Sequence, residues 1–263
     1  MPSLYAHNRF GKCVTEQLDG EIKDVVKKHY RQFSLGVQGP DILFFYRPFM
    51  KTAVSKCGYG MHDEFADPFF EKAAEVIRKK GRNSREYAYI LGFICHFALD
   101  SECHPYVEKM KEEINVSHME IESEFEKFLL RRDKRHPLAY PVWKHIPDDA
   151  ATVETVHQIF KQFKREQIKE ALVTQKLIKR FLTAPSKIKQ NFINFLLKIT
   201  GLYKHYHGLM HSYYDNPKCE ETNEELFRKF ENAISVAVNL ILSYDETVRG
   251  KKTINERFHR TYD

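Results

Sequence analysis

The pattern of apolar positions along the chain is typical of α-helices. Apolar residues recur at intervals of three and four over several long stretches, whereas the strict apolar–polar alternation of a half-buried strand is almost absent. We therefore predict an all-α fold, a single multi-helix domain. The expected helices span residues 4–30, 68–80, 85–103, 117–132, 152–182, 186–207 and 223–249.

Glycine and proline residues interrupt this pattern at definite places. Gly39 and Pro40 end the first periodic stretch. Between residues 40 and 68, apolar clusters alternate with further glycines and with Pro48, which predicts a long ordered connection of a kind that is often functional. Near the C-terminus, Asn223 precedes two acidic residues and is a candidate N-cap for the last helix.

The length and composition favour one soluble domain covering residues 1–263. No Pro-, Gly- or Ser-rich linker divides the chain, and hydrophobic residues at 42% with charged residues at 30% are typical of a globular protein. The longest apolar stretches, such as Ile234 to Leu242, are too short to span a membrane, so no transmembrane segment is expected. No signal-peptide pattern is visible, and we therefore expect a cytoplasmic location.

Charge and cysteine content narrow the range of partners only slightly. The formal charge of +6 would attract phosphate groups, but Lys and Arg are interleaved with Glu and Asp nearly everywhere. No specific nucleic-acid partner is therefore expected, and the oligomeric state is left open. The five cysteines are odd in number, scattered and without a C-x-x-C pair, which indicates reduced thiols rather than a disulfide framework.

The informative segment for chemistry is YAYILGFICHFALDSECHPYV, residues 87–107. His96 and Asp100 stand at i and i+4, so both side chains project from one helix face in otherwise apolar surroundings. Buried ionisable groups need partners, and a metal ion is an efficient one. His104 continues the stripe, but it would lie about 12 Å from His96 along the axis, which is too far for a single ion.

A second pair lies downstream, where SHMEIE places His118 and Glu122 at i and i+4. His104 would complete this second site, and Asp100 would stand between the two sites and could bridge them. Two ions roughly 3.5–4 Å apart form the usual clamp for displacement at phosphorus. The spacing therefore favours more than one metal ion.

Three further candidates lie upstream, outside regular helix or near a helix start: His7, Asp41 and His62. The turns LGVQGPD and GYGMHDEF, each rich in glycine, would present Asp41 and His62 to the helix face. The alternative for each residue is an ordinary surface or core role, since i,i+4 pairs of His with Asp or Glu also form on solvated helix surfaces.

The blocks LGVQGPD, LGFICHFALD and SHMEIE, together with His7 and His62, resemble the zinc-dependent phospholipase C family, whose relatives include the P1-type nuclease. The resemblance covers roughly residues 1–125. It implies an all-α fold of the phospholipase C/P1 nuclease type and two zinc ions, with a third left open. One zinc is implied at Asp41, His62, His96 and Asp100. A second is implied at His104, His118 and Glu122, and a third at His7 with Asp100.

The resemblance implies metal-dependent hydrolysis of a phosphodiester, with a phosphoester substrate for which a phospholipid is one candidate. Asp41 is the candidate catalytic residue, as a metal ligand or as a general base beside the attacking water. Four aromatic residues of the connection either line the mouth of the site or pack in the core: Phe44, Phe45, Tyr46 and Tyr59.

Two other interpretations stay open. The His62-Asp63 dipeptide is the mark of HD-type metal phosphohydrolases, but there it lies on a helix, whereas here it closely follows two glycines. A non-catalytic protein that contains metal and binds a phosphorylated ligand is the other possibility. In the C-terminal KHYHGLMH segment, the histidines His205, His207 and His211 are better explained by a solvated helix face than by a further metal site.

Overall fold

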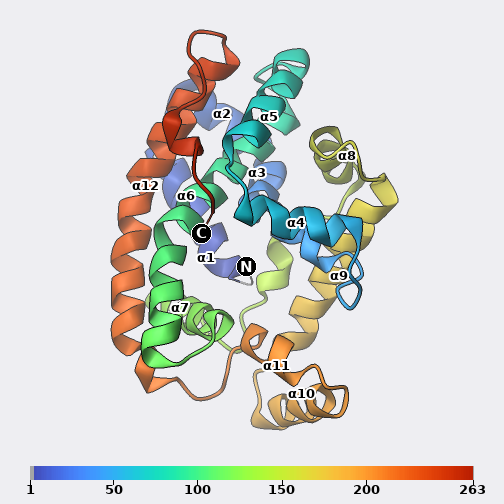
Figure 1. The fold of residues 1–263 in the computed structure, drawn as a ribbon, viewed down its shortest axis with the longest axis vertical. Coiled ribbons are helices and arrows are strands. Elements are labelled where there is room, and N and C mark those ends of the chain that lie inside the picture. The colour runs from blue at the N-terminus through green and yellow to red at the C-terminus, as the bar shows by residue number, and fades with distance from the viewer. Residues whose placement is uncertain (1–2, 263) are drawn as a thin grey trace.

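The computed structural model describes residues 3–262, except for the side chains of Lys204, His205 and His207. Within this range the regular elements are helices and no strand occurs, so the predicted all-α fold is confirmed (Figure 1). The first α-helices are α1 (Leu4–Gln17), α2 (Gly20–Lys28), α3 (Tyr30–Gly36), α4 (Ala53–Asp63), α5 (Asp67–Lys80) and α6 (Arg85–Ile114). They are followed by α7 (His118–Arg132), α8 (Ala150–Ile159), α9 (Arg165–Leu182), α10 (Lys187–Ile199), α11 (Tyr203–Tyr206) and α12 (Glu220–Val248). Short 3-10 helices lie at η1 (Gly39–Phe45), η2 (Val142–His145), η3 (His207–Leu209), η4 (Pro217–Cys219) and η5 (Glu256–Phe258).

Three helices predicted as continuous are divided, those at residues 4–30, 152–182 and 186–207, and the last of them forms α10 and α11. The first stretch forms α1 and α2, which are separated because Leu18 is extended and Gly20 has a φ of +52°, and α3 begins only at its last residue, Tyr30. The stretch from 152 to 182 is divided at Phe160, which leaves the helical conformation at the end of α8 while its ring stays in the core. Periodicity continues across the breaks at Gly20 and Phe160 because the apolar residues on both sides face the same core.

Two predicted helix ends are wrong. Helix α6 continues past the expected end at Cys103 and past Pro105, and it ends only at Asn115, which has a φ of +51°. A proline removes one backbone hydrogen bond, and here buried side chains on both sides of it keep the helix in place. Asn223 is not the N-cap of the last helix, because the turn of η4 starts α12 already at Glu220.

The connection between residues 40 and 68 holds more regular structure than predicted. It consists of η1 and of α4, whose start is capped by reciprocal bonds between Thr52 and Ser55. His62 therefore lies on the last turn of a helix rather than in a glycine-rich turn, and that expectation was wrong. The helix places this side chain toward the protein interior, where it is buried.

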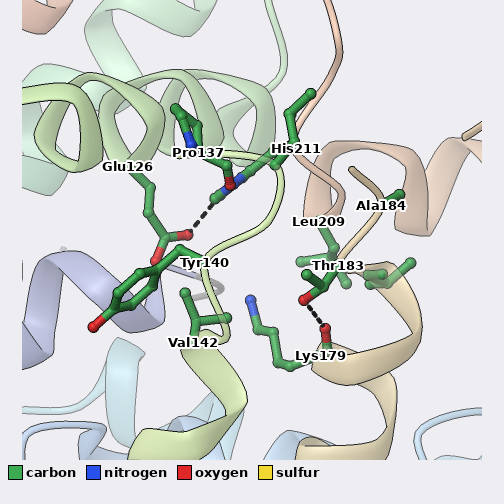
Figure 2. A pocket seen from close by; sticks show the side chains of 11 residues that line it. Glu126, Pro137, Tyr140, Val142, Lys179, Thr183, Ala184, Leu209 and His211 are labelled. Carbon is green, nitrogen blue, oxygen red and sulfur yellow. Dashed lines mark hydrogen bonds and ion pairs between the residues drawn. The ribbon is translucent and has the colours of Figure 1, made fainter. Parts of the chain in front are cut away.

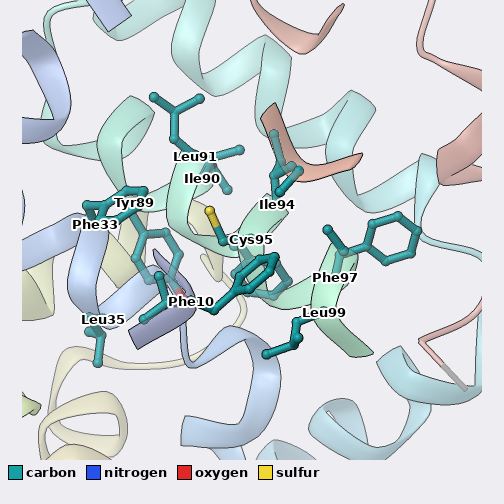
Figure 3. Close-up of a cluster of buried hydrophobic side chains, with 14 of the residues drawn as sticks. Phe10, Phe33, Leu35, Tyr89, Ile90, Leu91, Ile94, Cys95, Phe97 and Leu99 are labelled. Atoms are coloured by element: carbon teal, nitrogen blue, oxygen red, sulfur yellow. The ribbon is translucent and has the colours of Figure 1, made fainter. Parts of the chain in front are cut away.

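Helix α6 forms the centre of the core. Its residues from Tyr87 to Leu99 are almost completely buried, and α1, α3 and α12 pack against it (Figures 1 and 3). Gly36 of α3 and Gly92 of α6 permit this close packing: a Cβ at either would lie 2.0 Å from Tyr89 O or 2.2 Å from Phe33 O, respectively. The close contact brings the end of α3, and thus η1, beside the polar face of α6.

A second, smaller apolar cluster lies apart from the main core, where α9 leads into α10 (Figure 1). Its buried members are Leu182, Ala184, Ile193, Leu197 and Met210. None of the helices in residues 3–262 has the length and apolar character that a bilayer crossing requires.

Candidate metal centre

The structure brings all eight candidate residues into one buried region. They come from five elements: His7 from α1, Asp41 from η1, His62 from α4, His96, Asp100 and His104 from α6, and His118 and Glu122 from α7. Only the three from α6 and the two from α7 are neighbours on a helix. The packing of α1, η1 and α4 around α6 supplies the rest.

Asp100 is at the middle of this cluster. Its Oδ1 lies 3.3 Å from His7 Nε2 and 3.6 Å from His104 Nε2. Its Oδ2 lies 3.0 Å from His96 Nε2 and 4.0 Å from His62 Nε2. One carboxylate therefore faces four imidazole rings, with each oxygen directed at a different pair.

On one side of Asp100, two overlapping groups have a geometry that could hold a cation. The ligand atoms of Asp41, His62 and His96 lie within 4.8 Å of one another, as do those of His7, His96 and Asp100. Asp41 Oδ1 is 3.3 Å from His62 Nε2, and the His7 and His96 rings stack with centroids 4.5 Å apart. Because both groups use His96, they form one continuous set of donors.

The third group lies on the other side of Asp100. Glu122 Oε1 is 3.5 Å from His104 Nε2 and 2.8 Å from His118 Nε2, and the three ligand atoms lie within 4.8 Å of one another. His104 therefore lies between Glu122 and Asp100. This is the arrangement expected of two adjacent cation sites connected by a carboxylate.

Neighbouring groups orient two of the rings. His62 Nδ1 donates to the carbonyl of Gly58 at 2.9 Å, which leaves Nε2 directed at Asp41 and Asp100. His118 Nδ1 lies 2.5 Å from Glu108 Oε1. Metal-binding histidines usually donate the second ring N–H in this way. Sequence analysis missed Glu108, although its place four residues after His104 on the same helix was visible.

Many polar atoms of the cluster are buried without a protein hydrogen bond. They are both ring nitrogens of His7 and of His96, Nε2 of His62, Oδ2 of Asp100 and Oε2 of Glu122. Burying such atoms without a partner costs about 1–3 kcal/mol each. His, Asp and Glu side chains together are the donor set that zinc prefers when cysteine is absent. The residues present therefore fit a zinc centre.

The electrostatics of Glu122, Asp100 and His96 favour the protonation states that bind metal. At His118, by contrast, burial lowers the pKa but the neighbouring carboxylates Glu122 and Glu108 raise it above its ordinary value. Burial raises the pKa of Glu122, but the neighbouring His118 and His104 overcome this and lower it to about 2. In Asp100 the same opposition leaves the pKa well below its ordinary value, because three imidazole rings outweigh burial. Burial lowers the pKa of His96 and so favours its neutral form. The carboxylates are thus ionised at neutral pH.

Gly39 allows η1 to approach α6 at this point. Its φ is +52°, and a Cβ there would lie 2.1 Å from Cδ2 of His96. Only glycine accepts both the left-handed backbone and the contact with the ring. The turn at Gly39 and Pro40 therefore places Asp41 directly beside His96, as the sequence pattern suggested.

The four candidate aromatic residues divide into two pairs. Phe44 stacks on Tyr59 at 4.3 Å, and its centroid is 5.4 Å from that of His62. Tyr59 is largely exposed, whereas Phe45 and Tyr46 are buried. Only the first pair could line an entrance to the cluster.

Tyr262 is a neighbour of the cluster that no sequence pattern indicates. Its ring centroid is 5.3 Å from that of His62, its backbone N–H donates to His62 O, and it is buried. Asp63, by contrast, is exposed although it follows the buried His62. The dipeptide lies on helix α4, contrary to the expectation, but Asp63 belongs to none of the ligand groups among the described residues, which argues against the HD-type interpretation.

His211 does not lie on a solvated helix face, and that expectation was wrong. It follows η3 in an irregular segment, where Nε2 lies 3.0 Å from Glu126 Oε2 and Nδ1 donates to Pro137 O (Figure 2). These residues line a cavity of about 20 Å³, which is room for about one water molecule. The neighbouring His205 and His207 side chains lie outside the described residues.

Comparison with known proteins agrees with this geometry. A family model described as zinc dependent phospholipase C matches residues 6–177, which is more than half of the chain and includes all eight residues of the cluster. The comparisons with curated proteins and with solved structures found no match.

Proposed function

Because the chain belongs to the zinc-dependent phospholipase C family, we propose that it hydrolyses the phosphodiester bond of a phospholipid with zinc ions held in the cluster around Asp100. The observation that supports this most directly is the position of Asp100. Its two carboxylate oxygens face four histidine rings from three helices within 4.0 Å. A purely structural carboxylate needs no such surplus of imidazole partners.

The proposed ligand sets follow from the three groups. One zinc ion is held by Asp41, His62, His96 and Asp100. A second is held by His104, His118 and Glu122, with Asp100 as the bridge. His7 and Asp100 provide a third position, and His96 is the other residue whose ligand atom lies close to both. Bound zinc supplies charge neutralisation at the phosphoryl oxygens and lowers the pKa of a coordinated water toward about 7.

Asp41 is proposed as a ligand rather than as the general base. Burial raises the pKa of its carboxyl, but the neighbouring imidazoles of His62, with Nε2 at 3.3 Å, and of His96 help to hold it well below the usual range. A general base works best with a pKa near the working pH, so a strongly acidic carboxyl is better suited to bind a cation. Asp41 would then hold and orient the water that attacks phosphorus.

Phe44 and Tyr59 are proposed to contact the substrate. Their stacked rings adjoin His62, and the exposed Tyr59 ring lies at the solvent side of the pair. Aromatic faces beside a metal cluster can hold the apolar or quaternary-ammonium part of a lipid. Phe45 and Tyr46 have no such position.

The decisive experiment combines zinc analysis with turnover. Purified protein should contain at least two zinc ions per chain and hydrolyse a nitrophenyl phosphodiester and a short-chain phosphatidylcholine, with both activities lost on chelation and restored by zinc. His96→Ala and His118→Ala should each lose zinc and activity, while His136→Ala, at an exposed position, should retain both. Zinc binding without turnover of either substrate would instead favour a protein that binds a phosphorylated ligand.

A further inference from the structure

Helix α10 presents a continuous apolar stripe to solvent. Four residues at intervals of four, three and four project from one face. Their exposed fractions are 83% for Ile188, 57% for Phe192, 60% for Phe195 and 63% for Ile199. At about 1.5 Å of rise per residue, the stripe runs for most of the roughly 20 Å length of the helix. Isolated exposed apolar residues need no explanation, but an aligned set of four marks an interaction surface.

The opposite face of α10 already has its packing partners. Ile193 and Leu197 are buried in the small cluster with Leu182, Ala184 and Met210. The helix is therefore held on the body of the protein by one side, at the edge of the fold (Figure 1). The exposed stripe contributes to neither apolar cluster, so the fold itself does not account for it.

The positive charge of the protein is concentrated in the same segment. Between Glu170 and Asp215 the sequence contains no acidic residue and seven basic ones: Lys176, Lys179, Arg180, Lys187, Lys189, Lys198 and Lys204. The remainder of the chain has 35 basic residues (42 minus 7) against 36 acidic ones. The net charge of +6 thus comes entirely from this segment, because basic and acidic residues nearly balance in the rest of the chain.

Lysines flank the stripe along α10. Lys187 and Lys198 are exposed, and Lys189 is half-buried. At 100° per residue, the first two lie on one flank of the stripe and Lys189 lies on the other. Lys189 donates to Thr183 O at 2.7 Å, so the exposed cationic border is the flank with Lys187 and Lys198. An apolar strip beside a cationic border is the arrangement of a helix that lies in the interface of an anionic lipid bilayer.

We propose that α10 docks the protein on an anionic phospholipid membrane, with the apolar stripe inserted among the acyl chains and the flanking lysines at the headgroups. The inference rests on the proposed function in one respect, since a phospholipid substrate supplies the reason for a membrane surface. A second copy of the chain is a poorer occupant of this face, because pairing two stripes would bring their lysines together and like charges repel.

The exposed loop between η1 and α4 adjoins this region. Tyr206 of α11 donates its hydroxyl hydrogen to Pro48 O at 3.1 Å, and its ring centroid is 5.8 Å from that of Phe49. Phe49 and Met50 are both largely exposed. Helix α11 packs against α10, and the loop joins the elements that carry Asp41 and His62. Helix α11 thus connects the helix proposed to dock with the loop between Asp41 and His62.

The test measures vesicle binding without turnover. Zinc-loaded protein is sedimented with vesicles of non-hydrolysable phosphonate analogues of phosphatidylcholine, alone or with about one third of the phosphatidylserine analogue. We expect binding to the anionic vesicles, weakened about tenfold or more in Phe192→Gln/Phe195→Gln and in Lys187→Gln/Lys198→Gln. Leu242→Gln removes an exposed apolar residue of α12 outside the stripe and should bind like the wild type.

Absence of binding by the wild type, or equal binding by the stripe variants, would overturn the proposal. So would a change in sedimentation coefficient caused by the stripe variants, because that would identify the face as an interface between two copies. Zinc-dependent hydrolysis of a soluble nitrophenyl phosphodiester should be unchanged in these variants. The hydrolysis assay tests the proposed function, and vesicle binding tests membrane docking. Failure of one proposal can therefore be distinguished from failure of the other.

Discussion

The Nε2 atom of His7 lies 3.3 Å from Oδ1 of Asp100, and both side chains are almost completely buried. The two residues are far apart in the sequence and belong to different helices, α1 and α6. Their contact adds a buried polar pair to the apolar packing that holds the N-terminal helix against the central one. Replacing either side chain by an apolar one would leave the other buried with fewer polar partners.

Asp100→Asn should lower zinc content by at least one ion per chain and reduce turnover on the order of 100-fold or more, since an amide binds zinc poorly and cannot bridge two ions. Zinc titration and phosphodiesterase rates measure the two effects. Asp63→Asn, at the exposed carboxylate of α4, is the matched control and should leave both unchanged. Full zinc content in Asp100→Asn would contradict the bridging role.

Glu108→Gln should lower the affinity for the zinc ion nearest His118 by about 10–100-fold, because the carboxylate that orients the His118 ring through Nδ1 is lost. The other ion should keep its affinity. Competition with a chromogenic chelator resolves the two steps. Glu112→Gln changes an exposed carboxylate on the same helix, and a similar loss in that variant would show that overall charge, not ring orientation, is responsible.

Gly39→Ala should destabilise the protein by roughly 1–3 kcal/mol and disturb metal binding, through a strained backbone and a clash with His96. Gly81→Ala is the matched control, since its φ of +87° is also positive but no atom lies within 4 Å of the added Cβ. Denaturant unfolding gives the stability, and zinc analysis gives the occupancy. Equal zinc content in both variants would show that the His96 contact has no role in the site.

Chelation should lower the thermal midpoint of the wild type by about 5–10 °C if zinc is present at about 100 times its dissociation constant. Ligand binding to the folded state alone then contributes about 2.7 kcal/mol, and one kcal/mol shifts the midpoint of a domain this large by about 2–4 °C. Scanning calorimetry with and without added zinc measures the change. His96→Ala should show a smaller response to the chelator.

Asp245→Asn should cost roughly 2–3 kcal/mol near neutral pH, because Asp245 receives hydrogen bonds from Tyr87, Arg82 and Arg249. Burial raises the pKa of this carboxyl, but the bonds from Tyr87 and Arg82 lower it below its ordinary 3.8. When the pKa of a carboxyl is lower in the folded state, its ionised form stabilises the fold at pH values above the unfolded-state pKa. This stabilisation is lost as the pH falls through the folded-state pKa.

The difference in unfolding free energy between wild type and Asp245→Asn should therefore be constant above about pH 5 and shrink below about pH 4. Urea unfolding at a series of pH values measures it. Asp24→Asn, at an exposed carboxylate of α2, should show no such trend. A difference that grows with acidification would mean that the carboxyl is not stabilised in its ionised form.

The sequence by itself determined what is local. Helical periodicity identified the all-α fold, because the side chains that face the core recur every three or four residues whatever the tertiary packing. The pairs His96 with Asp100 and His118 with Glu122 were recognisable for the same reason, since i,i+4 spacing places two side chains on one helix face. Family-specific blocks allowed the more distant His7, Asp41 and His62 to be named.

The family resemblance implied which distant ligands meet, but only the tertiary structure shows their contacts and the residues around them. The contact of His7 with Asp100, the support of His118 by Glu108 and the proximity of Tyr262 depend on how helices pack, and no local periodicity encodes that. The breaks at Gly20 and Phe160 were equally hidden, because apolar residues on both sides face one core. The stripe on α10 needed burial to be seen, since its spacing matches that of an ordinary core face and only exposure to solvent distinguishes the two.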